Sequence, residues 1–173
     1  MSESPRLLAR VAALFYVLVF VTGGAALAVR GQLGTMLNLM ATICYIVVTA
    51  LFYELFKPAG RTLSLTAAFF SLVGCAVGAI NPGNGNVSLV FFGCYCILIG
   101  CLVLRATFMP RFVGVGMLIA GAGWLTFLWP PLAQRLAPFN MLPGMLGEAV
   151  LTLWLLAMGV NAERWRAAAA EAS

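Results

Sequence analysis

Charged residues are scarce and histidine is absent in this chain of 173 residues. Only 9% of the residues are Asp, Glu, Lys or Arg, whereas a soluble domain carries about 25%. The apolar share is 63%, and this composition excludes an ordinary soluble domain and predicts an integral membrane protein. No charged or low-complexity tract marks a boundary, so we expect a single domain over residues 1–173.

The lack of histidine removes the commonest general base and a common metal ligand. No Cys-x-x-Cys pair is present either, so we expect no metal site and no cofactor. The cysteines fall within apolar runs, where a buried cysteine most often acts as a small hydrophobic side chain; they are Cys44, Cys75, Cys94, Cys96 and Cys101. Spacing alone identifies no pair of nucleophile and base.

The basic residues stand singly or in pairs at the ends of apolar runs. They form no basic stripe with interleaved aromatic residues, so no nucleic-acid partner is expected. The expected partner is the lipid bilayer.

Six apolar runs each approach the roughly 20 residues that a helix needs to cross a bilayer. They cover residues 8–29, 34–56, 62–80, 87–104, 112–129 and 142–160. Backbone polar groups cannot stay unpaired in lipid, and the alternation of membrane strands is absent. We therefore expect an all-α, polytopic bundle of six transmembrane helices.

The connections between these runs predict the orientation. One set of connections and ends holds Arg6, Arg10, Lys57, Arg61, Arg105, Arg111, Arg164 and Arg166, whereas the other holds Arg30 and Arg135. The positive-inside rule places the first set, and with it both termini, in the cytoplasm. A cleaved export signal ending near Ala28 is the alternative for the first run, but that run is longer than a signal core.

Two connections on the outer side have distinct compositions. Residues 81–86, NPGNGN, form a concentrated turn sequence. Residues 130–144 contain four prolines around LAQRLA, which predicts a short interfacial helix or lid over the outer end of the bundle.

Small residues concentrate inside the runs, where they let helix backbones approach closely. Gly74 and Gly78 form one such pair, and the fifth run carries Gly114, Gly116, Ala120, Gly121, Ala122 and Gly123. Packing within the bundle is the favoured interpretation, and a homo-oligomer through these faces is the alternative.

Glu148 is an acid inside the last apolar run. A charged residue at the bilayer centre costs about 2.5 to 3.5 kcal/mol on insertion scales, so a functional site is the default hypothesis there. At 1.5 Å per residue, Glu148 lies roughly 9 Å below the outer surface. Glu54, by contrast, lies near the cytoplasmic end three residues before Lys57, where an ion pair explains it.

The same depth count predicts a polar layer in the outer leaflet around Glu148. Its other candidate ligand-binding residues are Asn38, Thr22, Thr42, Thr126, Thr152, Arg30 and Arg135. Thr152 shares a helix face with Glu148 at a spacing of four residues. In one interpretation, Glu148 pairs with Arg30 or Arg135, or bonds Asn38, and locks helices together. In the other, it lines an outward-facing cavity that binds a cation or polar head group, or carries a proton.

Four stretches together resemble the bacterial membrane-protein family known as domain of unknown function 4386: LLARVAALFYVLVFVTGG, YELFKPAGR, FFGCYCILIGCLVLRATFMPRFVGVGMLIAGAGWL and GEAVLTLWLLAMGVN. The matching positions are Phe56, Lys57, Pro58, Pro110, Arg111, Gly147, Glu148, Leu153 and Trp154. The resemblance implies a small multi-pass protein of the bacterial inner membrane and carries no established activity. It also implies a histidine in the fourth span, where this chain has Tyr95.

Three functions follow as hypotheses. The first is a non-enzymatic protein that binds or conducts a small or lipidic ligand through an outer-leaflet cavity at Glu148. The second is a membrane-embedded lipid-modifying enzyme, with Glu148 as acid or base and Asn38 or Tyr95 assisting. The third is a structural or assembly partner of another membrane protein, in which Glu148 holds helices together.

Overall fold

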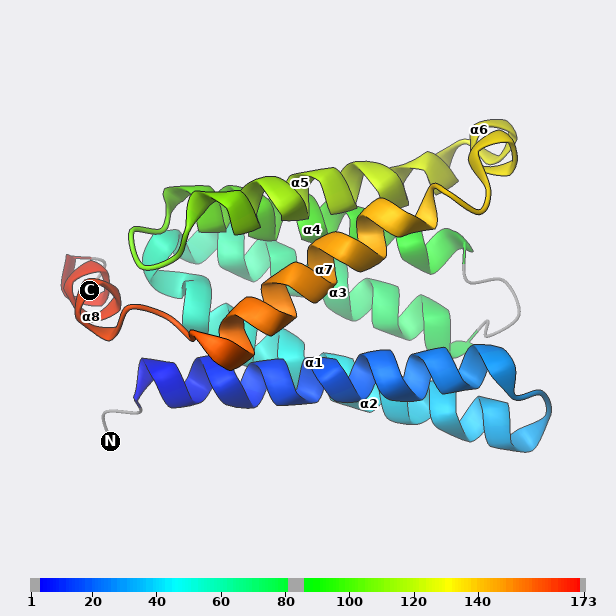
Figure 1. The fold of residues 1–173 in the computed structure, drawn as a ribbon, viewed down its shortest axis with the longest axis horizontal. Helices are drawn as coiled ribbons and strands as arrows, with labels where there is room; N and C mark the ends of the chain where they lie inside the picture. The colour runs from blue at the N-terminus through cyan, green and yellow to red at the C-terminus, as the bar shows by residue number, and fades with distance from the viewer. Residues whose placement is uncertain (1–3, 81–85, 172–173) are drawn as a thin grey trace.

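The computed structural model describes residues 4–80 and 86–171, and all regular structure in these ranges is helical (Figure 1). The elements are α1 (Pro5–Ala28), α2 (Gln32–Phe56), η1 (Lys57–Ala59), α3 (Arg61–Ile80), α4 (Asn86–Arg105), α5 (Arg111–Leu125), η2 (Thr126–Leu128), α6 (Pro130–Leu136), α7 (Met141–Ala157) and α8 (Ala162–Glu171). The predicted all-α class is confirmed. The turn predicted at residues 81–86 lies, except for Asn86, outside the described residues.

Five helical segments are long and apolar enough to cross a membrane: α1, α2 together with η1, α3, α4, and α5 together with η2. The sixth apolar run forms α7, which has 17 residues and is bent by 80° from the short α6 that precedes it. The described residues therefore contain five candidate spans, or six when the bent pair counts as one.

The six long helices form a closed ring. Each of α1 to α5 packs against its neighbour in the sequence, and α7 then packs against both α5 and α1. In Figure 1, α7 runs obliquely between them, from α6 at one end of the bundle towards the start of α1 at the other. We call the end near α6 the outer end and the end near α8 the inner end.

The inner half of the ring is filled by large apolar side chains. Those that are nearly or completely inaccessible to solvent include Phe52, Leu55, Phe56, Ile99, Leu102, Val103, Val113, Leu151 and Leu155. Alanines of α1, among them Ala9 and Ala13, let that helix approach the same core. This half of the molecule is closed.

The glycines of α5 pack inside the bundle, whereas Ala122 of the same helix is exposed. A Cβ atom at Gly114 would lie 3.0 Å from the Gly100 carbonyl oxygen of α4, and one at Gly147 of α7 would meet the Gly116 carbonyl oxygen and Ala120. Glycine is required at these crossings because a larger side chain would force the helix backbones apart.

The fifth predicted run, 112–129, corresponds to a candidate span over Arg111–Leu128, which is α-helical to Leu125 and continues as the short 3-10 helix η2. The structure adds one helix to the prediction. The predicted short helix between the prolines is present as α6. The helix α8 was not predicted, because its residues are mostly alanine and charged side chains.

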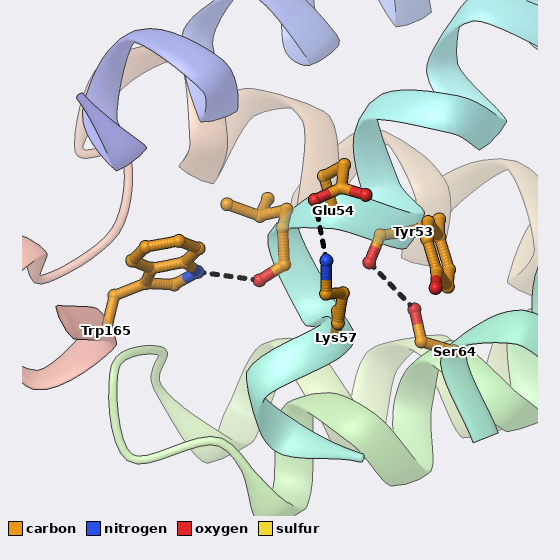
Figure 2. A network of polar contacts seen from close by, with 6 residues as sticks. Tyr53, Glu54, Lys57, Ser64 and Trp165 are labelled. Atoms are coloured by element: carbon orange, nitrogen blue, oxygen red, sulfur yellow. Dashed lines mark hydrogen bonds and ion pairs between the residues drawn. The ribbon is translucent and has the colours of Figure 1, made fainter. Parts of the chain in front are cut away.

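Local contacts explain how α8 begins and where it lies. Gly159 takes a positive φ of 67° after α7, which turns the chain, and the Asn161 side chain accepts a hydrogen bond from the Arg164 amide at 3.1 Å. The Trp165 indole donates to the Leu55 carbonyl oxygen at 2.8 Å. Figure 2 shows this bond near the end of α2, beside the ion pair of Lys57 with Glu54 at 3.3 Å. That ion pair confirms the prediction for Glu54.

Candidate functional site

Glu148 lies near the middle of α7 and is 7% exposed. Three other helices contribute its partners: Tyr16 of α1 donates its hydroxyl to Oε2 at 2.7 Å, and Trp124 of α5 donates its indole N–H to Oε1 at 2.7 Å. The Cys96 thiol of α4 donates to Oε1 at 3.4 Å. One carboxyl group therefore joins four of the six helices in the ring.

The hydrogen bonds at Tyr16 continue to α2. The Tyr16 and Tyr45 hydroxyl oxygens lie 3.0 Å apart. Because Tyr16 gives its single proton to Glu148, Tyr45 must be the donor between the two hydroxyls. When Glu148 is protonated, the chain can reverse, so that Glu148 donates to Tyr16 and Tyr16 donates to Tyr45. This arrangement can accommodate both protonation states of the acid.

Tyr95, whose ring packs beside that of Tyr45, has a buried hydroxyl that is unpaired within the described residues. It is 1% exposed, its hydroxyl makes no hydrogen bond within the described residues, and its ring centroid is 6.0 Å from that of Tyr45. A buried hydroxyl without a partner is costly, so such groups often mark a place where water or a ligand binds.

A cavity of about 520 Å³ opens above Glu148 in the outer half of the bundle. Glu148, Tyr45 and Trp124 lie at the polar part of its wall, together with Asn38 and Thr42 of α2. The rest of the wall is mainly apolar and comes from α1, α3, α4 and α7, which contribute Val19, Phe20, Leu27, Cys75, Leu89, Phe92, Met141 and Met145. Apolar walls with a few convergent polar groups are typical of sites for small molecules.

The structure brings Glu148, Asn38 and Thr42 to this one cavity. Thr42 donates its hydroxyl to the Asn38 carbonyl oxygen at 2.9 Å. The Asn38 side-chain amide makes no hydrogen bond within the described residues, so it is available to a ligand.

Other members of the predicted polar layer lie elsewhere. Thr22 donates to the Leu18 carbonyl oxygen at 2.6 Å, and Thr152 donates to the Glu148 carbonyl oxygen at 2.7 Å, so both hydroxyls are used within their own helices. Thr126 contacts Asn140 near α6, where its hydroxyl accepts a hydrogen bond at 3.1 Å. None of the three is among the residues that line the cavity.

The predicted pairing of Glu148 with an arginine or with Asn38 is wrong in the described part of the chain. Arg30 and Arg135 are exposed and form no ion pair there, and the donors to Glu148 are instead Tyr16, Trp124 and Cys96. These three residues fall in apolar runs and look like core residues. Counting depth from the outer ends of the runs would have pointed to Trp124, whereas no sequence feature pointed to Tyr16 or Cys96.

The arrangement can do two things chemically. It can hold a carboxyl group in a membrane interior with its oxygens already satisfied, which stabilises the ring. It can also present that carboxyl group, with the Tyr45 hydroxyl and the Asn38 amide, to a molecule in the cavity. No group of three or more potential His, Cys, Asp or Glu ligands that could hold a metal occurs in residues 4–80 and 86–171.

Comparisons with known proteins identify the family of the chain. An uncharacterized protein of Archaeoglobus fulgidus is 27% identical over 148 aligned positions, which cover 72% of this chain and 89% of that protein. No solved structure matches the chain. The family profile called domain of unknown function (DUF4386) matches residues 28–85 and 83–159. Since these matches cover most of the sequence, the chain belongs to the DUF4386 family.

Proposed function

We propose that this protein binds a small amphiphilic molecule, lipidic or lipid-soluble, in the outer cavity that ends at Glu148. It does so as a single domain, residues 1–173, that crosses the bacterial inner membrane six times with both termini in the cytoplasm. The observation that carries the proposal is the cavity of about 520 Å³ with a buried carboxyl group in its wall.

Size and lining both support this ligand class. Pockets for small molecules typically measure about 300 to 1,000 Å³ and are mostly apolar with a few placed polar groups. The apolar part of the wall fits a hydrocarbon or aromatic moiety, and the polar groups of Asn38, Tyr45 and Glu148 fit one head group.

The charge of the cavity restricts which head groups the ligand can carry. Glu148 is an acid, and neither Lys nor Arg is among the lining residues in the described part of the chain. An anionic head group would meet a carboxyl group with no compensating cation, which is unfavourable in a low-dielectric site. The ligand is therefore neutral or cationic and offers hydrogen-bond donors.

Binding fits the closed inner half of the ring better than conduction does. Below Glu148, Phe52, Phe56 and Leu155 fill the interior with less than 2% exposure. A conduction path would require these side chains to move, whereas binding requires only the outer cavity.

A membrane-embedded enzyme is the second candidate, favoured by the 2.7 Å hydrogen bond between Tyr16 and Glu148. Two titratable groups at this distance can act as general acid and base. In that case the cavity holds a substrate that is converted during incubation. A pure assembly partner, the third hypothesis, needs no cavity.

The test is native mass spectrometry of the intact protein, with extraction and identification of co-purified small molecules. Two variants should each remove the ligand for a different reason. Glu148→Gln changes the polar end of the cavity. Gly24→Leu adds a side chain to the cavity wall, at a position where a Cβ atom meets no atom within 4 Å. Ala122→Leu is the matched control, an exposed position on α5 that does not line the cavity.

We expect one specific molecule to accompany the wild-type protein and Ala122→Leu and to be lost from both cavity variants. Recovery of a chemically converted form of an added ligand, dependent on Glu148, would establish the enzyme instead. If all four proteins carry the same lipids at the same level, the cavity is not a binding site.

A further inference from the structure

A second pocket, of about 390 Å³, lies at the inner end of the bundle. It is walled by η1, by the connection between α4 and α5, and by α8. Its lining includes Arg105 from the end of α4 and Arg164 from α8, two residues that lie far apart in the sequence. This pocket is distinct from the outer cavity and does not depend on its function.

The wall formed by α8 is fixed by several contacts. The Asn161 amide donates to the Phe108 carbonyl oxygen at 3.1 Å, and the Trp165 indole donates to the Leu55 carbonyl oxygen (Figure 2). Trp165 and Ala168 face the core, whereas the charged residues of α8 are exposed. An amphipathic helix held at the end of membrane spans is placed at the level of lipid head groups.

The two arginines retain free hydrogen-bond donors. Arg164 uses Nη1 to donate to the Thr107 carbonyl oxygen at 3.2 Å, which positions the guanidinium group in the pocket and leaves its other N–H groups available. Arg105 makes no hydrogen bond or ion pair within the described residues. One acid, Glu171, also lines the pocket, so its lining residues carry one net positive charge.

We propose that this pocket binds the phosphate of an anionic phospholipid head group between Arg105 and Arg164. The planar guanidinium group matches the oxygens of a phosphate and forms paired hydrogen bonds with it. Basic pockets at the ends of membrane helices recognise anionic head groups for this reason. The rim of alanine and proline, formed by Pro58, Ala59 and Ala167, leaves room for the head group.

A simpler explanation of these arginines is that they set the orientation of the chain in the membrane. That role requires positive charge but no pocket. Arg166 separates the two explanations, because it lies on α8 two residues after Arg164 and does not line the pocket. Arg166→Gln therefore removes the same charge from the same helix and serves as the matched control.

The experiment measures lipid retention by native mass spectrometry, and thermal unfolding, for the full chain in nonionic detergent with added phosphatidylglycerol or phosphatidylcholine. We expect phosphatidylglycerol to bind in preference to phosphatidylcholine. Each of Arg105→Gln and Arg164→Gln should weaken its binding about fivefold, which corresponds to the roughly 1 kcal/mol that one basic residue contributes near anionic lipid. Arg166→Gln should bind like the wild type.

Arg105→Gln is the deciding variant, because Arg105 supports no contact that folding would need. Equal weakening by Arg105→Gln and Arg166→Gln, or equal retention of the two lipids, would overturn the proposal. Inorganic phosphate is tested in parallel. Competition by phosphate at low millimolar concentration, abolished by Arg105→Gln, would keep the phosphate site and identify a soluble ligand as its source.

Discussion

The outer and inner halves of this helical ring are built differently. The inner half is packed with Phe, Leu and Val side chains that are almost fully buried, whereas the outer half surrounds a cavity of about 520 Å³. Glu148 lies at the boundary, with hydrogen bonds to three helices. The difference indicates that the interior of the inner half provides close packing, whereas the outer half leaves the space in which the proposed ligand would bind. Glu148 belongs to both halves.

The largest effect is expected from removing the acid at this boundary. Glu148→Ala leaves the Trp124 N–H without an acceptor, whereas the Tyr16 hydroxyl can still bond to Tyr45. The free energy of unfolding should therefore fall by about 2 to 4 kcal/mol. Equilibrium unfolding by sodium dodecyl sulfate in mixed micelles, followed by circular dichroism, measures this change. Glu54→Ala, which removes an exposed acid, should change stability by less than about 0.5 kcal/mol. Similar losses in the two variants would show that the network around Glu148 does not hold the ring.

The next largest effect should come from truncating a buried side chain in the closed inner half. Phe52→Ala empties a fully packed position of α2, and in lipid the cost is mainly that of the lost packing, about 2 to 3 kcal/mol. Phe20→Ala is the matched change in the open half, where the side chain already borders the cavity, and it should cost less than about 1 kcal/mol. The same unfolding assay applies. An equal cost at both positions would abolish the distinction between the halves.

The smallest effects are expected from alanine substitutions at two helix glycines. A Cβ atom at Gly100 would lie 2.9 Å from the Gly114 carbonyl oxygen, so Gly100→Ala should destabilise by about 1 to 2 kcal/mol. A Cβ atom at Gly24 meets nothing within 4 Å. Gly24→Ala should therefore stabilise by up to about 1 kcal/mol through helix propensity. The thermal midpoints of the two variants measure these changes. A shift of both midpoints in the same direction would contradict the prediction.

The long helices could be predicted because their cause is local. Each apolar run has the length of a membrane span, and the ends of the runs carry the prolines, glycines and basic residues that end helices. The helix α8 was missed because its ten residues, mainly alanine and charged side chains, are too few and too polar for a span. Its start was nevertheless encoded, since Asn161 is a good N-cap and Glu163 lies in the first turn.

The candidate site could be predicted only in part. Counting residues along each run placed Asn38, Thr42 and Glu148 at one depth, and the structure shows that all three line one cavity. Depth does not give the order of helices in the ring or the rotation of each helix. Tyr16 and Trp124 could therefore not be identified as partners of Glu148, and the exposed arginines were expected in their place.

The closure of the ring has a consequence for biosynthesis. Tyr16 and Glu148 are separated by 132 residues, and α7 is the last long helix to leave the ribosome. At about 5 to 20 residues per second, Glu148 is made roughly 7 to 26 seconds after Tyr16. During that interval the first five helices can insert, but the Tyr16 hydroxyl lacks Glu148 as its acceptor. The ring can therefore close only after α7 has been made, because α7 is the helix that contacts both α5 and α1.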